Sequence, residues 1–245
     1  MKATLRQRVP PACIDNVFVF MHLFGRWTPS NVCKHVDMQD DIWKAITGAC
    51  VLQVADVLRT AFASLPHVSV LELGCGSGLA SELLCEKITA TTKVQTWIAT
   101  DILPLWKSVK HFARTCITFA QSHYVQAVHD FGRNANVLLL IAPLAHELPA
   151  FRRGFASGTL LVNDNAEFYC GYADYYAIKM FIEQQTESTT PRLLVFVGEL
   201  GVAHGSQGLY YYLFNHPRLQ IEERCALADP SATIVNHEVF VFKIK

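Results

Sequence analysis

The residues with the clearest chemical use in this sequence are three closely spaced glycines. They alternate with small polar residues in a run made of Gly74, Cys75, Gly76, Ser77 and Gly78. An apolar stretch at 68–73 precedes the run and a helical pattern at 79–88 follows it, so the glycines occupy a strand-to-helix turn. Glycines let a backbone approach a ligand without a side-chain clash, and a helix N-terminus offers unpaired N–H groups. The run therefore predicts a loop that cradles a cofactor.

The spacing of the glycines distinguishes two classes of cofactor. Dinucleotide-binding loops carry G-x-G-x-x-G, whereas the third glycine comes one residue earlier here. An acidic residue, Glu72, stands two positions before the first glycine. The acidic lead followed by G-x-G-x-G resembles the first motif of the class I S-adenosylmethionine-dependent methyltransferases. A nicotinamide-dependent oxidoreductase stays as an alternative that the spacing disfavours.

The resemblance implies roles for acidic residues at strand ends. In that family the acidic residue of the first motif acts at the amino group of the methionine moiety, and the loop backbone packs against this moiety. A carboxylate at the end of the second strand takes the ribose hydroxyls, since it can accept two hydrogen bonds from a vicinal diol. An acceptor for the adenine amino group often ends the third strand. The implied cofactor-binding residues are Glu72, Gly74, Cys75, Gly76, Gly78, Asp101, Ile102, Asp130 and Phe131.

Candidates for the methyl-acceptor side lie in two later loops. In the resembled family, acceptor groups come from the loop after the fourth strand, at 142–147 here. Enzymes that methylate amino groups of DNA bases carry Asn/Asp-Pro-Pro-aromatic in that loop, and the Ala-Pro-Leu sequence at 142–144 argues against this reaction. His146, Glu147 and, after the fifth strand, Glu199 are the candidate catalytic residues, with His146 suited to proton transfer near neutral pH.

Strand and helix patterns alternate along most of the chain. Helices are expected at 39–62, 79–88, 106–121, 172–185 and 208–215. Strands are expected at 68–73, 94–100, 123–128, 137–142, 193–197, 219–227 and 238–244. This alternation predicts an α/β protein with a doubly wound, mostly parallel, Rossmann-like seven-stranded sheet and helices on both faces. The final two strands have no helix between them, which predicts an antiparallel last strand.

The domain organisation leaves one choice open. Residues 1–37 read as an N-terminal cap segment, and residues 38–245 as the methyltransferase-like domain. The fifth strand is either 159–162 or 193–197. We favour 193–197, because it leaves the last two strands as a hairpin and places about 144–170 in an insertion.

Composition narrows the class of protein and its partners. Hydrophobic residues make up 51% of the chain and charged residues 17%, which excludes a disordered protein. Lys plus Arg and Asp plus Glu are 21 each, so no basic field favours a nucleic-acid acceptor. No apolar run is long enough to span a membrane, so we expect no membrane partner. The eight cysteines form no C-x-x-C pair, so we expect no metal site. The first residues do not resemble a signal peptide, and we therefore expect a reduced, cytoplasmic protein.

These observations favour an enzyme that transfers a methyl group from S-adenosylmethionine to a small molecule or a protein side chain. The alternative is a non-catalytic methyltransferase-fold protein that serves as a binding or scaffold module, because the acceptor loop carries no recognisable motif. The two differ in whether bound cofactor is consumed.

Overall fold

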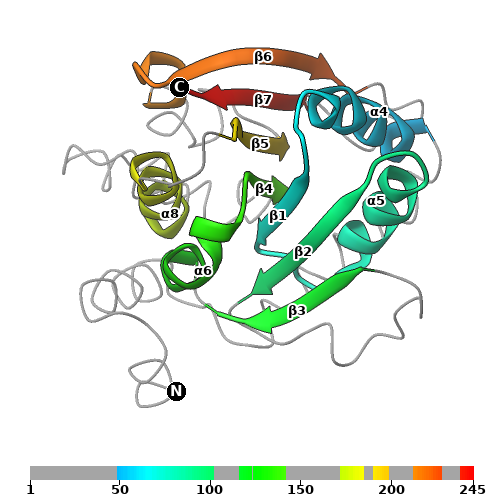
Figure 1. Ribbon diagram of the computed structural model, residues 1–245, viewed down its shortest axis with the longest axis horizontal. Coiled ribbons are helices and arrows are strands. Elements are labelled where there is room, and N and C mark those ends of the chain that lie inside the picture. Colours follow the sequence, from blue (N-terminus) through cyan, green and yellow to red (C-terminus); the bar gives the residue numbers. More distant parts are fainter. Residues whose placement is uncertain are drawn as a thin grey trace, which may run out of the picture.

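Seven strands pair into one mixed sheet. The computed structural model describes residues 49–101, 116–122, 124–141, 172–184, 190–198, 212–227 and 238–245. Its strands are β1 Val68–Leu73, β2 Val94–Asp101, β3 Ile117–Gln121, β4 Val137–Ile141, β5 Arg192–Gly198, β6 Leu219–Ala226 and β7 Glu238–Ile244. They pair in the order β3-β2-β1-β4-β5-β7-β6 (Figure 1). The first five strands pair in parallel, and β7 runs antiparallel to both β5 and β6. The expected sheet with its antiparallel last strand is confirmed.

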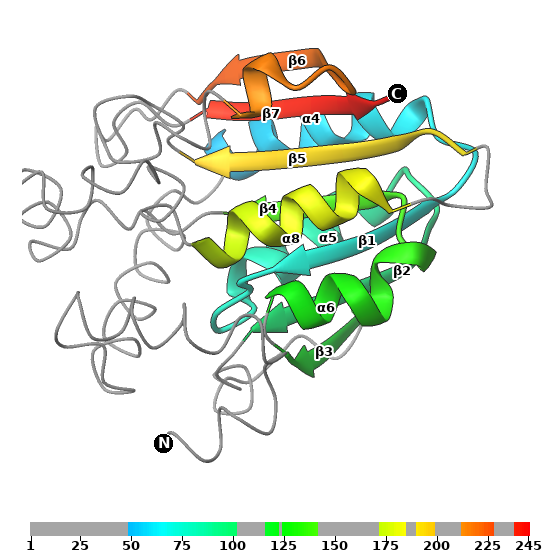
Figure 2. The ribbon, with the colours of Figure 1, turned by 90° about the vertical axis from the view of Figure 1, so that its left-hand side faces the viewer.

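Helices cover both faces of this sheet, as expected (Figures 1 and 2). α4 Ala49–Ala63 and α5 Leu79–Thr89 pack on one face, and α6 Tyr124–Phe131 and α8 Tyr172–Glu183 pack on the other. The core divides accordingly, because successive residues of a strand point to opposite faces. Val70 of β1 joins the core under α4 and α5, and Leu71 joins the core under α6 and α8. Within the described residues, no helix has the length and apolarity needed to cross a membrane.

The structure resolves the choice of fifth strand. β5 Arg192–Gly198 pairs with β4, and its residues 192–197 are buried, as is the whole of β4. The assignment of 193–197 to the fifth strand is therefore confirmed. The alternative at 159–162, the proposed insertion at about 144–170 and the cap at 1–37 lie outside the described residues.

Two elements differ from the expectation. Residues 117–121 form β3, where the pattern indicated the end of a helix at 106–121, and residues 124–131 form α6, where it indicated a strand at 123–128. β3 is an edge strand of five residues, too short for its alternation to be distinguished from a helical pattern. α6 buries Val125, Ala127 and Val128 within one short apolar run, and such a run fits a strand as well as a helix.

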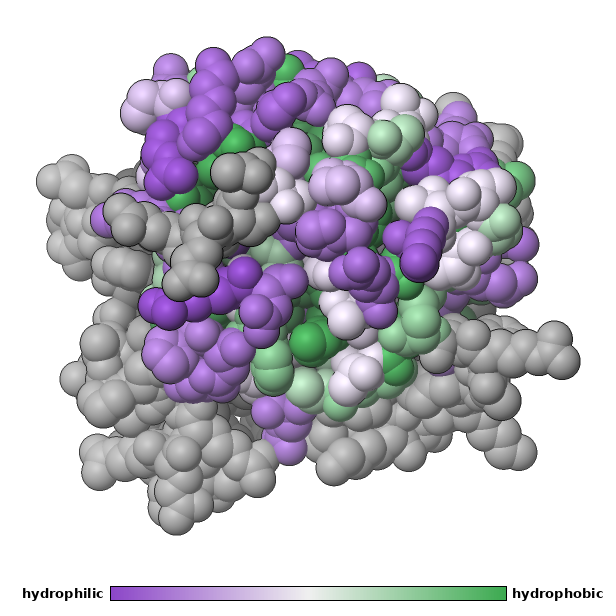
Figure 3. All heavy atoms as spheres, in the orientation of Figure 1, coloured by the Kyte–Doolittle hydropathy of each residue, from purple (hydrophilic) through white to green (hydrophobic). Residues whose placement is uncertain are grey.

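Charged side chains protect the β6 edge of the sheet from pairing with another chain. β6 forms this edge, and hydrophilic side chains gather over it at the top of Figure 3. Arg224 makes a two-point ion pair with Glu238 of β7 at 2.8 and 3.0 Å, and Lys243 of β7 pairs with Glu222 at 3.3 Å. The β6–β7 register also shifts between Ile221 and Glu223. Charges and irregular register both hinder pairing of an edge strand with another chain.

A buried arginine ties the amino end of β5 to the helices of one face. Arg192 is 6% exposed and donates hydrogen bonds to the carbonyl oxygens of Phe181 (2.7 Å), Gln184 (3.3 Å) and Gly132 (3.3 Å). Its guanidinium also lies 3.7 Å from the centre of the Phe181 ring. Burial lowers the pKa of Arg192 to about 10, so the side chain stays charged at neutral pH. One side chain therefore satisfies backbone carbonyls at the ends of α6 and α8.

Candidate functional site

The loop between β1 and α5 has left-handed backbone at each of its three glycines. The φ angles are 77° at Gly74, 55° at Gly76 and 83° at Gly78. Residues other than glycine rarely adopt these backbone angles. Gly78 is the N-cap of α5, and its carbonyl accepts the first helical hydrogen bond from the N–H of Glu82 at 3.0 Å. The expected unit of strand, glycine loop and helix is confirmed.

The end of β2 holds this loop in place. The N–H groups of Gly74 and Cys75 both donate to the carbonyl oxygen of Thr100, at 2.8 and 3.0 Å. The N–H of Gly76 donates to Oδ2 of Asp101 at 3.0 Å. Asp101 is half-buried and is the last residue of β2. Asp101 ends the second strand, as the sequence predicted, and the structure adds that its carboxylate fixes the loop backbone. Its role toward the ribose hydroxyls stays a prediction.

Glu72 lies under the loop and faces the protein interior. It is 1% exposed, and its two carboxylate oxygens accept hydrogen bonds from Ser81 Oγ at 2.7 Å and Trp97 Nε1 at 2.8 Å. Burial raises the pKa of Glu72 to about 7, the two hydrogen bonds oppose this shift, and the charge of Asp101 adds to it. Glu72 therefore links β1, α5 and β2. Its role toward the amino group of a cofactor stays a prediction.

Cys75 contributes its backbone to the site. Its side chain is 8% exposed, and burial, with the nearby charges of Glu72 and Asp101, raises the pKa of the thiol. The thiolate is the nucleophilic form of cysteine, so this buried side chain is unsuited to attack. The backbone N–H bonded to Thr100 is its contribution to the loop.

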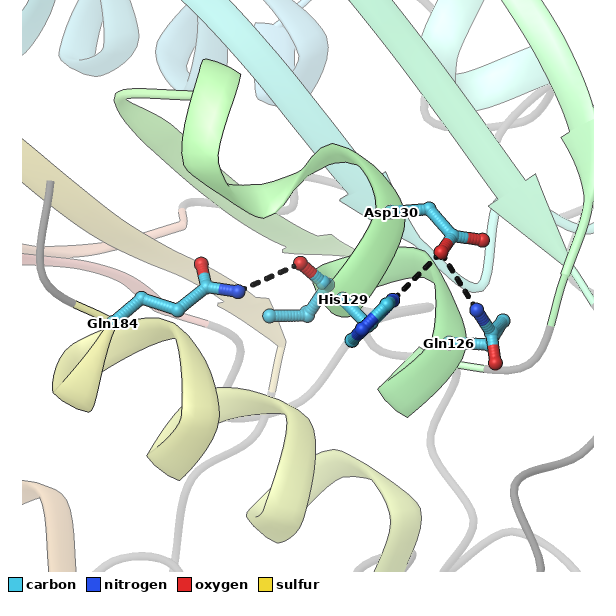
Figure 4. Close-up of polar contacts among 5 residues, drawn as sticks. Gln126, His129, Asp130 and Gln184 are labelled. Carbon is cyan, nitrogen blue, oxygen red and sulfur yellow. Dashed lines mark hydrogen bonds and ion pairs between the residues drawn. The ribbon is translucent and has the colours of Figure 1, made fainter.

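The expectation that Asp130 ends the third strand is wrong. Asp130 lies on α6, its side chain is 41% exposed, and it contacts Gln126 Nε2 at 2.6 Å and His129 Nδ1 at 2.8 Å (Figure 4). The same figure shows α6 bound to α8 on another side, where Gln184 Nε2 donates to the carbonyl oxygen of Val128 at 3.0 Å. Phe131, half-buried, is the last residue of α6. Neither Asp130 nor Phe131 ends a strand, so the structural basis for their adenine contacts is lost.

Gln121 and Ser122 occupy the position that the sequence assigned to Asp130. Gln121 ends β3 and stands opposite Asp101 in the β2–β3 register. The N–H of Ser122 donates to the carbonyl oxygen of Asp101 at 2.9 Å. Both residues therefore adjoin the end of β2. The alternation of Ile117 and Phe119 toward the core was the signal for this strand.

Tyr124 is a second residue that the sequence did not single out. It begins α6, and its hydroxyl lies so close to Gly74 that a Cβ at position 74 would overlap it. Gly74 is therefore required both for its positive φ and for this close approach. The sequence pattern predicted a strand at 123–128 and so missed this contact. A helix that begins at Tyr124 places this residue in the first helical turn, beside the loop.

The remaining candidates belong to parts of the chain that the structure does not describe. Ile102, His146, Glu147 and Glu199 lie outside the described residues. The described part of the site therefore consists of the glycine loop, Glu72, Asp101, the end of β3 and Tyr124.

Comparison with known proteins relates this architecture to a known fold. The sequence matches no protein-family model, and no curated protein matches it. A solved structure from Listeria monocytogenes, provisionally described as a class I S-adenosylmethionine-dependent methyltransferase, aligns over 90% of this chain and 70% of that chain, with 14% identity and a TM-score of 0.50. The chain has the class I methyltransferase fold. An identity of 14% establishes the fold alone.

A second structure is similar over the full length of the chain. It is magnesium protoporphyrin IX methyltransferase from Synechocystis, solved with bound S-adenosylmethionine. The alignment covers 100% of this chain and 97% of that chain, with 14% identity and a TM-score of 0.49. In the methyltransferase fold of the present chain, the glycine loop, Asp101 and Ser122 all lie at the carboxyl ends of the parallel strands β1, β2 and β3. Open α/β sheets bind their ligands at this edge.

Proposed function

We propose that this protein binds S-adenosylmethionine at the glycine loop and transfers the methyl group to a small molecule or a protein side chain. The observation that carries the proposal is the hydrogen bond from Gly76 N–H to Asp101 at 3.0 Å. This bond places a carboxylate from β2 beside a left-handed glycine loop that leads into a helix N-terminus. Backbone N–H groups and a carboxylate acceptor thus meet at one point of the sheet edge.

The loop residues fit the cofactor by shape. Gly76 presents backbone without a side chain, so a ligand can approach the main chain closely there. Tyr124 lies against Gly74 and supplies a polar hydroxyl and an aromatic ring beside this surface. A nucleoside with an amino-acid tail needs both exposed backbone groups and an apolar wall, and this combination supports the proposal.

The carboxylates fit the cofactor by charge. Bound S-adenosylmethionine supplies a methyl group on a positively charged sulfur. The Asp101 carboxylate accepts a hydrogen bond from Gly76, and acceptance of hydrogen bonds from a vicinal ribose diol is the role that we propose for it, because an ionised carboxylate has about four lone-pair sites. Glu72 lies one strand away and adds negative charge when it ionises.

The transfer itself requires alignment of donor and acceptor, and for some acceptors the removal of a proton. The glycine loop and Asp101 would orient the donor. His146, Glu147 and Glu199 are the proposed proton acceptors, from the loops after the fourth and fifth strands. The neutral charge of the chain disfavours a nucleic-acid acceptor, and this supports a small molecule or a protein side chain as the proposed acceptor.

Calorimetric titration with S-adenosylmethionine tests cofactor binding. Asp101→Asn keeps an acceptor for Gly76 N–H but loses the charge, and we expect its affinity to fall about tenfold or more, because hydrogen bonds to charged groups contribute roughly 1.5–3 kcal/mol. Asp130→Asn makes the same chemical change on the exposed face of α6 and should bind as the wild type does. A folded wild-type protein that does not bind about 1 mM cofactor, or that binds NAD instead, would contradict the proposal.

Consumption of the cofactor tests catalysis separately. Incubation with S-adenosylmethionine and a panel of small-molecule and peptide acceptors should yield S-adenosylhomocysteine and an acceptor heavier by one methyl group, both measured by mass spectrometry. Binding without turnover across the panel would favour the non-catalytic alternative.

A further inference from the structure

Two cysteine thiols outside the cofactor site lie against each other. Cys85 of α5 and Cys116, which directly precedes β3, place their Sγ atoms 3.1 Å apart. Both are free thiols. A disulfide bond is about 2.0 Å long, so a movement of roughly 1 Å would join the two sulfurs. Such a movement is within the range of side-chain rotation at a surface position.

The two thiols differ in their access to solvent. Cys85 is 1% exposed, whereas Cys116 is exposed. Burial also raises the pKa of Cys85, which keeps its thiol protonated. The thiolate is the form that reacts with oxidants, and an oxidant must reach it. This asymmetry assigns the first oxidation to Cys116 and leaves Cys85 as the partner that completes the bond.

We propose that Cys85 and Cys116 form a reversible disulfide that hydroperoxides drive, with Cys116 oxidised first. The Cys116 sulfur attacks a peroxide oxygen, so that an S–O bond forms, the O–O bond breaks, and the alcohol or water leaves with the thiol proton. The Cys85 sulfur then attacks the Cys116 sulfur, so that the S–S bond forms, the S–O bond breaks, and hydroxide leaves as water with the Cys85 proton. The two sulfurs together lose two electrons and the peroxide gains them. A dithiol reductant returns the disulfide to two thiols by thiol–disulfide exchange and is itself oxidised to a disulfide.

The disulfide would act on stability and leave the cofactor site intact. Cys85 lies six residues after the start of α5, about 9 Å along the helix. Cys116 lies before the amino end of β3, whereas the cofactor site adjoins its carboxyl end. The bond would therefore tie α5 to an edge strand away from Asp101. The inference does not depend on the proposed methyl transfer.

Peptide mapping of the full-length protein tests this pairing. The reduced protein is treated with hydrogen peroxide, alkylated under denaturing conditions, and digested with trypsin and a glutamyl endopeptidase. Cleavage after Glu82 separates Cys75 from Cys85, and cleavage after Arg114 and Arg133 isolates Cys116. We expect one dominant cross-link, between the Cys85 and Cys116 peptides, and its loss on reduction.

Thermal unfolding supplies a second readout. The disulfide would close the loop between residues 85 and 116, and this should raise the Tm of the oxidised protein by about 5–15 °C over that of the reduced protein. Cys116→Ser should lose both the cross-link and the shift. Cys225→Ser removes a partly exposed thiol on β6 and should keep both. Sulfinic acid at Cys116 without a cross-link, or a dominant link from Cys116 to another cysteine, would overturn the proposal.

Discussion

At the scale of single residues, Glu72 combines two properties that usually exclude each other. It is buried, which disfavours its charge, yet both of its oxygens accept hydrogen bonds, which favours the charge. Burial is the larger effect, so the pKa rises from 4.5 to about 7. Between these values the folded protein holds a proton that the unfolded chain has released. The contribution of Glu72 to stability is therefore fully present below about pH 4.5 and is lost as the pH rises through about 7.

Glu72→Gln removes this titration while keeping both contacts, because an amide oxygen can accept from Trp97 and an amide N–H can donate to Ser81. We expect the free energy of unfolding of the variant, relative to wild type, to rise by about 2 kcal/mol between pH 5 and pH 8. Denaturant unfolding across this pH range measures it. Glu86→Gln changes an exposed carboxylate on α5, the helix that carries Ser81, and its free energy of unfolding relative to wild type should change by less than about 0.5 kcal/mol over the same range. Parallel pH profiles for wild type and Glu72→Gln would show that Glu72 does not titrate in this range.

At the scale of elements, Arg192 connects β5 to the ends of α6 and α8. Arg192→Met keeps most of the apolar stem but removes the donor to two buried carbonyls and a partly buried one, so we expect a loss of about 2–4 kcal/mol in the free energy of unfolding. Arg224 on β6 is a matched control, because it also lies over a phenylalanine ring but is 52% exposed. Arg224→Met should cost less than about 1 kcal/mol. Equal losses for the two variants, in denaturant unfolding, would contradict the structural role of Arg192.

The elements also show how far the sequence predicts this fold. β1, β4 and β5 are apolar strands with clear boundaries, and the glycine loop with Asp101 could be placed from motif and spacing alone. The sequence pattern predicted a helix where β3 lies and a strand where α6 lies. Both elements are short and lie at or near an exposed edge of the sheet, so few buried residues reveal a helical or an alternating pattern. That exchange of helix and strand moved the expected adenine contact to Asp130. It also concealed Tyr124, whose approach to Gly74 depends on tertiary packing and leaves no local pattern.

At the scale of the whole molecule, the cofactor site and the thiol pair lie at opposite ends of β3, about 13 Å apart along the strand. Sites at this separation that share no partner usually contribute additively to stability. Cofactor at 100-fold its Kd should stabilise the native state by about 2.7 kcal/mol, or roughly 5–10 °C in Tm. We expect this shift to be the same in the oxidised and the reduced protein, so that the two increments add. Scanning calorimetry of the four states measures both increments. If the cofactor no longer raised the Tm after oxidation, the disulfide would be altering the glycine loop through α5, and the two sites would not be independent.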